Sequence, residues 1–278
     1  MTGSKETHRP PLSGIWWASF DFARSPFYYV VIIYVFSTYF AESVVGDSAR
    51  GQAIFSSTVT FAGLVMAILA PFLGGYMDRG GAKKPVLLGL MTLLAAASAG
   101  LGFVTPGSAI AIPLGMVLLV VSACCYSISE LFHNALLPAA GTRLQIPAIS
   151  GLGLSMGSLA AVAVLLLVFY YLKSPPWGLT EQDVARLSGA LCAVWLITFI
   201  LPFLFGMPEL YQRGASWRTA RFLPLVWTPV KATKQLFAEH SDIMKFLIAR
   251  MIFMDGLTAL FTIGAVYVSG VLGWTRSE

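Results

Sequence analysis

Charged side chains are scarce in this chain of 278 residues, in which Asp, Glu, Lys and Arg together make up only 11%. Soluble domains carry about 25% charged residues, so this deficit excludes an ordinary soluble protein. Hydrophobic residues make up 57% of the chain and are gathered in long blocks. The blocks Val86–Val104 and Ser108–Ser129 contain no charge at all. Each can cross roughly 30 Å of hydrocarbon as a helix, so the sequence predicts an all-α integral membrane protein.

Cysteine and histidine are also scarce, with three of each. Cys124, Cys125 and Cys192 lie inside apolar stretches without the spacing of metal ligands, so we expect no metal site and no cofactor. The sequence offers no nucleophile–base constellation and no phosphate-binding loop, which argues against an enzyme. The net charge is +5, but the basic residues are spread between hydrophobic blocks, so we expect no nucleic-acid partner.

Seven hydrophobic segments are bounded by turn-forming residues and charges. They run from Trp16 or Ser25 to Val45, Gln52 to Met77, Val86 to Val104, Ala109 to Leu137, Ile149 to Leu172, Val184 to Phe205, and Phe246 to Leu272. Pro175 and Pro176 end the fifth segment because proline cannot continue a helix. Thr180 and Asp183 are typical of a capping box at the start of the sixth. The start of the chain lacks a signal-peptide pattern, so the first segment is expected to be retained.

Basic residues between the segments are biased toward one side of the membrane. That side holds Lys5, Arg9, Arg24, Arg79, Lys83, Lys84, Arg143, Arg213, Arg218, Arg221, Lys231, Lys234 and Lys245, whereas the other holds Arg50, Lys173, Arg186 and Arg276. Cytoplasmic loops carry an excess of Lys and Arg, so we predict a cytoplasmic N-terminus in a cytoplasmic (inner) membrane.

The pattern predicts four parts. They are a cytoplasmic tail (residues 1–15), an N-terminal six-helix bundle (16–207), a cytoplasmic linker (208–245), and the first helix of an incomplete second bundle (246–278). Thr228 and Pro229 are typical of a helix start in the linker. Val230, Leu236 and Phe237 can share one face, which favours an amphipathic helix on the membrane surface over a mobile linker. Transporters built from two six-helix bundles have this layout.

The most specific motif lies between the second and third segments. It consists of Gly74, Asp78, Arg79, Gly81, Lys83 and Lys84. Glycines permit a tight reversal, and lysines hold such a turn on the cytoplasmic side. The motif resembles the cytoplasmic signature of the major facilitator superfamily at every defined position. The resemblance implies a gate latch whose partner lies in the second bundle.

Charges at bilayer depth cost about 2.5–3.5 kcal/mol each, which makes them functional candidates. The candidates for a substrate or proton pathway are Asp21, Arg24, Glu130, His133, Asn134, Arg250 and Asp255. Asp21 and Arg24 lie at the cytoplasmic end of the first segment and are spaced to form an ion pair, whose role can equally be structural. Glu130 and His133 fit a proton relay or, as the favoured alternative, a structural helix contact. Asp255 lies about 15 Å into the membrane and is the strongest candidate for a coupled carboxylate.

Small residues mark the start of the fifth segment. Gly151, Gly153 and Gly157 are spaced to let helices approach closely. Gly153 and Gly157 partly match the antiporter signature of the superfamily, but its proline is missing, so helix packing is the favoured interpretation.

Several stretches together resemble one branch of the superfamily, the vacuolar amino-acid effluxers linked to autophagy and their bacterial relatives. The stretches are Trp17–Ser25, Phe132–Pro138, Ser150–Gly153 and Met254–Gly256. The chain departs from that pattern at Arg24 and at Met254, where asparagine is usual. The resemblance implies export or exchange of small amino-acid-like solutes driven by an ion gradient.

The favoured hypothesis is a secondary active transporter with a small-molecule substrate, a coupling ion that we expect to be H+, surrounding membrane lipids, and alternating access between two bundles. The alternative is a non-transporting seven-helix membrane protein, either a truncated remnant, an assembly partner or a receptor. A retinal protein needs a lysine in the seventh segment, and Phe246–Leu272 has none.

Overall fold

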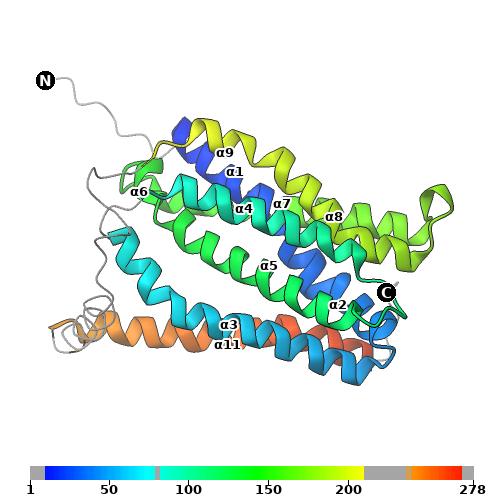
Figure 1. Ribbon diagram of the computed structural model, residues 1–278. Coiled ribbons are helices and arrows are strands. Elements are labelled where there is room, and N and C mark those ends of the chain that lie inside the picture. The colour runs from blue at the N-terminus through cyan, green and yellow to red at the C-terminus, as the bar shows by residue number, and fades with distance from the viewer. Residues whose placement is uncertain (1–9, 79–81, 210–236, 238, 271–278) are drawn as a thin grey trace, which may run out of the picture. The chain divides into compact units, whose positions relative to one another are not determined.

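The computed structural model describes residues 10–78, 82–209, 237 and 239–270. They belong to two units, Met1–Trp217 and Arg218–Glu278, each of which is described by itself. Every regular element in the described ranges is a helix, as Figure 1 shows. This confirms the predicted all-α membrane fold.

The first span changes its winding along its length. It consists of α1 (Leu12–Phe27), the π-helical segment η1 (Tyr28–Tyr34), α2 (Phe36–Tyr39) and a second π-helical segment, η2 (Phe40–Val44). Pro26 lies inside α1 just before the first π segment and has no N–H to continue the hydrogen-bond ladder. The backbone N–H of Val35 donates to the carbonyl of Val30, five residues earlier, over 2.9 Å. A hydrophobic span can therefore contain π-helical turns that cannot be predicted from its amino-acid composition.

The other spans of the first unit are regular helices. They are α3 (Ser48–Asp78), α4 (Lys84–Gly100) with the 3₁₀ turn η3 (Leu101–Phe103), α5 (Ala111–Asn134), α7 (Ile146–Lys173), and α8 (Glu181–Phe199) continued by α9 (Leu201–Gly206). Short turns α6 (Leu137–Ala140) and η4 (Pro176–Gly178) flank α7. Helix α7 ends at Lys173, before the proline pair, as predicted. The side chain and backbone of Thr180 form the predicted capping box with Asp183 at the start of α8.

Six helices of the described part of the chain are long and apolar enough to cross a membrane: Leu12–Val44, Ser48–Met77, Lys84–Phe103, Ala111–Asn134, Ile146–Lys173 and Glu181–Gly206. Large apolar side chains face outward from them, among them Leu154, Leu166 and Val194. Such a surface is stable against lipid tails but not against water, because nothing polar covers it.

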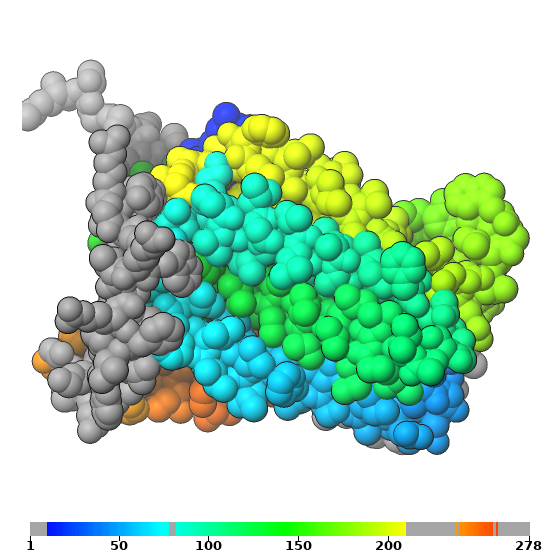
Figure 2. All heavy atoms as spheres, viewed as in Figure 1, coloured from blue at the N-terminus to red at the C-terminus, as the bar shows by residue number. Residues whose placement is uncertain are grey.

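The helices of the first unit pack around α1 and α4. Helix α1 lies along α7 and also contacts α8, while α4 lies between α5 and α8, and α3 packs on α5. In Figure 1 these helices run alongside one another, and Figure 2 shows α3, α4, α5 and α9 forming one continuous face. The largest fully buried side chains include Phe20, Phe36, Phe40, Phe132 and Phe203, so aromatic rings fill the core.

The second unit contributes α11 (Ser241–Gly270). This helix covers the predicted seventh segment as far as Gly270. The proposed amphipathic helix from Thr228 lies outside the described residues, except for Phe237.

Candidate functional site

The close contact of α1 with α7 depends on two of the predicted glycines. A Cβ atom on Gly153 would lie 2.8 Å from Cζ3 of Trp17, and one on Gly157 would lie 2.5 Å from Oγ of Ser25. Glycine therefore lets α7 lie directly against the segment of α1 that carries Asp21. Gly151 differs from the prediction, because it is exposed and a Cβ atom there would meet nothing within 4 Å. It precedes Gly153 by two residues and so points to another side of the helix.

Asp21 and Arg24 lie inside helix α1. This helix begins at Leu12, four residues before Trp16, so the pair lies nine and twelve residues after its first residue. Nη2 of Arg24 donates to Oδ1 of Asp21 over 3.1 Å. The two residues thus form the i,i+3 ion pair that their spacing predicts.

The Arg24 guanidinium also joins the first span to the fourth. Its Nη1 donates to the backbone carbonyl of Tyr126 over 3.2 Å and lies 3.6 Å from Oε2 of Glu130. Its Cζ lies 4.3 Å from the centroid of the Tyr126 ring and 5.5 Å from that of Phe20. Ion pairing and cation–π contacts therefore hold a buried cation between two helices. Only its Nε lacks a hydrogen-bond partner.

His133 completes the cluster from α5. Its ring stacks between those of Trp17 and Phe20, with centroid distances of 4.0 and 4.3 Å. Nε2 of His133 lies 3.0 Å from the carbonyl oxygen of Trp17, and Nε1 of Trp17 donates to the carbonyl of His133 over 3.0 Å. A carbonyl only accepts, so Nε2 must carry the ring proton. Nδ1 is then the bare nitrogen of the neutral ring, and it lies 3.8 Å from Oδ1 of Asp21.

The four ionisable groups of this cluster do not balance in charge. With Asp21 and Glu130 ionised, Arg24 charged and His133 neutral, the sum is one negative charge. The Glu130 side chain is 53% exposed, whereas Asp21 and Arg24 are largely buried and balance each other in charge. Asp21, Glu130 and His133 can each take up one proton, and one such proton would bring the sum of the four charges to zero. Asn134 is the last residue of α5 and is exposed, so it lies outside the cluster.

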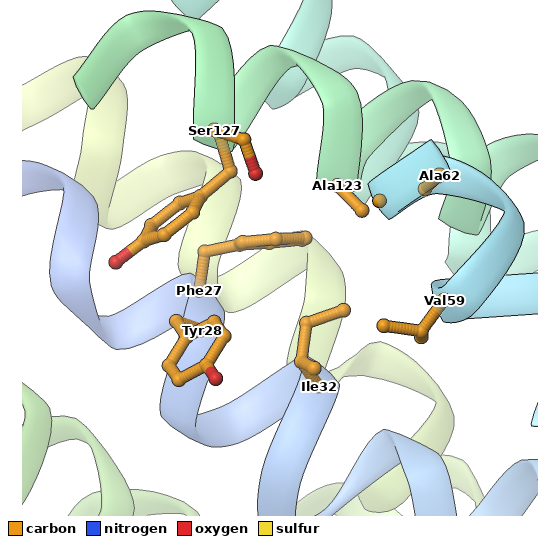
Figure 3. Close-up of a pocket in the computed structure, with 9 residues that line it drawn as sticks. Phe27, Tyr28, Ile32, Val59, Ala62, Ala123 and Ser127 are labelled. Carbon is orange, nitrogen blue, oxygen red and sulfur yellow. The ribbon is translucent and has the colours of Figure 1, made fainter. Parts of the chain in front are cut away.

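An apolar pocket adjoins the cluster. It encloses about 430 Å³ of space, part of it open to the outside, and Tyr126 forms part of its wall. Figure 3 shows its labelled lining residues, which come from the first span (Phe27, Tyr28, Ile32), from α3 (Val59, Ala62) and from α5 (Ala123, Ser127). The rings of Tyr28 and Tyr126 stack with centroids 5.4 Å apart. Because Tyr126 faces both the pocket and Arg24, a ligand in the pocket would lie next to the charged cluster.

The motif between α3 and α4 is described in part. Gly74 is in α3 and a Cβ there would meet nothing within 4 Å, while Asp78 is the last residue of that helix. Arg79, Gly81 and the Asp78 side chain lie outside the described residues. The backbone N–H groups of Lys83 and Lys84 donate to the two carboxylate oxygens of Glu209 over 3.0 and 2.7 Å.

The side chain of Lys84 forms a second connection between the start of α4 and the end of the sixth span. Its Nζ donates to the carbonyls of Leu204 and Met207 over 2.8 and 2.7 Å. A carboxylate caps the N-terminus of α4, and an ammonium caps the C-terminus of α9, each at the favourable end of a helix dipole. The start of α4 is therefore hydrogen-bonded to Glu209 and to the end of the sixth span.

Arg250 and Asp255 are five residues apart on α11 and both are exposed. They belong to the second unit, and no ion pair joins the two side chains in the described part of that unit.

The residues of these sites that the sequence interpretation overlooked include Trp17, Tyr28, Tyr126 and Glu209. Three of them carry a simple signal, because Trp17, Tyr28 and Tyr126 lie four residues from Asp21, Arg24 and Glu130 respectively, and so share a helix face with a charged residue. Glu209 had no such signal, because its contact bridges 125 residues of chain.

Two stretches of the chain, residues 43–146 and 142–278, match the family model described as "Vacuole effluxer Atg22 like". Together they cover most of the chain. The chain belongs to the Atg22-like vacuole effluxer family. A curated relative in this family, autophagy-related protein 22 of Eremothecium gossypii, is 25% identical over 162 residues. The aligned stretch is 51% of this chain and 31% of that protein, so the chain spans about a third of the relative's length. No solved structure matches it.

The family is described as one of effluxers, that is, of membrane transport proteins. The predicted resemblance to this family is thereby confirmed. The matched residues include the stretch around His133, whereas Trp17–Ser25 precedes them. Among the described residues of this Atg22-like protein, no group of three His, Cys, Asp or Glu side chains is arranged to hold a metal ion.

Proposed function

We propose that the protein is a secondary active transporter of a small amino-acid-like solute, coupled to protons. The observation that carries the proposal is the cluster of the buried residues Asp21, Arg24 and His133 with the more exposed Glu130, which adjoins a pocket. Ionisable groups within a membrane span are expensive and usually serve ion or substrate movement.

Asp21 and His133 are the groups we propose to exchange the proton. Nδ1 of His133 faces the Asp21 carboxylate at 3.8 Å, which leaves room for one proton to reside on either group. Arg24 stays charged and holds Asp21 in place. Asp255 on α11 is a second proposed carboxylate of the coupling pathway.

The test is transport by the protein reconstituted in proteoliposomes. We expect Asp21→Asn to abolish uptake of an amino acid driven by a proton gradient, while exchange of the same solute without a gradient continues. Asp255→Asn is expected to behave in the same way. Coupled uptake that is unchanged in both variants would remove these carboxylates from the mechanism, and absence of transport by the unmodified protein would reject the transporter itself.

We also propose that the N-terminus is cytoplasmic and that the motif from Gly74 to Lys84 acts there as a gate latch in alternating access. The bias of basic loops supports this orientation. Single cysteines at Thr142 and Ser108, which are exposed in loops at the two ends of the bundle, test it in a background without native cysteines. We expect a membrane-impermeant reagent to reach position 142 only from inside and position 108 only from outside. The reverse labelling pattern would show that the protein has the opposite orientation in the membrane.

A further inference from the structure

Arg24 pairs with two carboxylates that differ in distance and in burial. Asp21 lies 3.1 Å away and only 16% of its side chain is exposed, whereas Glu130 lies 3.6 Å away with 53% exposed. The Tyr126 carbonyl and two aromatic rings fix the guanidinium further. The Glu130 carboxylate is therefore the contact that can leave Arg24 without rearranging the helices.

The pocket lies one helical turn away from this loose contact, on the same helix faces, and neither Arg24 nor Glu130 lines it. Tyr28 follows Arg24 by four residues, and Tyr126 and Ser127 precede Glu130 by four and three. Residues at these spacings lie one above the other on a helix surface. A molecule in the pocket therefore lies one helical turn from the Arg24–Glu130 pair, against the Tyr126 ring that Arg24 covers.

The chemistry of this position favours one kind of ligand group. The pocket walls are mostly apolar, so they suit a carbon skeleton. A guanidinium fixed in orientation is a strong receptor for a carboxylate, which its planar donors match in geometry.

We propose that Arg24 binds the carboxylate of a ligand held in this pocket, and that this carboxylate displaces Glu130. This inference rests on the proposed transport function and names the ligand chemistry of the same site. Glu130 occupies the second anion position at Arg24 while the pocket is empty, and Asp21 stays paired with Arg24 in either state. The ligand class is a small molecule with one carboxylate and an apolar remainder.

Equilibrium binding to the purified protein, measured by calorimetry, tests the exchange. The probes are valine, valinamide, which lacks the carboxylate charge, and 3-methylbutanoate, which lacks the amine. We expect valine to bind at least about tenfold more tightly than valinamide, the factor that corresponds to one charge-assisted contact. Binding of 3-methylbutanoate would show that the carboxylate suffices, and its failure beside tight valine binding would show that the site also requires the amine.

Three variants separate the possible explanations. Arg24→Gln should remove the preference for valine over valinamide. Glu130→Gln, which keeps Arg24, should tighten the binding of valine several-fold and leave that of valinamide unchanged, because the competing carboxylate is gone. Arg186→Gln is the matched control at another Asp–Arg pair and should change neither.

Three outcomes would overturn the inference: equal binding of valine and valinamide, weaker valine binding in Glu130→Gln, or no carboxylate binding at all. The fate of the transport proposal is separate. Proton-driven transport without a carboxylate preference removes this inference alone. Carboxylate binding that depends on Arg24, found without proton-driven transport, removes the proposed function and leaves the binding site.

Discussion

The first unit contains two Asp–Arg pairs that are nearly identical in local geometry. In both, the residues are three apart on a helix, and Nη2 of the arginine donates to Oδ1 of the aspartate, over 3.1 Å for Asp21–Arg24 and 2.9 Å for Asp183–Arg186. In both, Nη1 donates to a backbone carbonyl of another element, that of Tyr126 at 3.2 Å or Gly102 at 3.0 Å.

The pairs differ in what surrounds them. The side chains of Arg24 and Asp21 are 6% and 16% exposed, and two further ionisable groups adjoin them, whereas those of Arg186 and Asp183 are 24% and 32% exposed. Asp183 also belongs to the capping box that starts α8. The same local motif therefore serves as a helix start in one place and as the centre of a buried charged cluster in the other.

Removing each arginine is the strongest test of this difference. We expect Arg24→Met to lower the free energy of unfolding by about 3–5 kcal/mol, because it leaves the buried Asp21 carboxylate without its cation. Arg186→Met, the matched control, should cost about 1 kcal/mol or less, since water screens that pair. Denaturant unfolding in detergent micelles measures both. Equal losses would mean that burial does not distinguish the pairs.

A smaller effect is expected from the helix that supports only the buried pair. Gly157→Ala would place a Cβ atom 2.5 Å from Oγ of Ser25 and 3.3 Å from Cβ of Asp21, so α1 and α7 must separate slightly. We expect a loss of about 1–3 kcal/mol in the same unfolding assay. Gly151→Ala, where the space is open, should change stability by less than about 0.5 kcal/mol. A cost as large at Gly151 would contradict the proposed close contact.

The smallest effect concerns the less buried pair, Asp183 and Arg186. Thr180→Ala removes the hydroxyl that donates to the Asp183 carboxylate over 2.7 Å and accepts from its backbone N–H. Loss of an N-cap costs about 1 kcal/mol, and that is the destabilisation we expect. Thr198→Ala in the same helix removes only a bond to the carbonyl of Val194 and should be nearly neutral. A neutral Thr180 variant would show that the Asp183–Arg186 pair starts α8 without the cap.

Much of the fold was predictable because the bilayer leaves few choices. Long apolar segments must be helices there, since no water satisfies their backbone groups. The helices α3 and α4 begin before the predicted segments, at Ser48 and Lys84, because a helix does not have to end where charged residues begin. The C-terminal end of α7 and the start of α8 were predicted well, because proline and a capping box act locally.

The site was predictable only in part. The residues of the charged cluster were identified because ionisable groups stand out in apolar segments. Their assembly was not, because Trp17 and His133 are 116 residues apart and meet through the packing of α1. The π-helical segments left no trace in hydropathy, since widening a helix changes its winding and not its composition.

The winding of the first span makes its length critical. An α-helix turns by about 100° per residue. A π-helical segment turns by less per residue, because each of its hydrogen bonds spans five residues in place of four. Phe36, Tyr39 and Phe40 point into the core beyond one such segment, on the far side of it from Asp21 and Arg24. Deleting a single residue between Tyr28 and Tyr34 would swing these three rings toward the lipid. The span therefore tolerates changes of side chain more easily than a change in its number of residues.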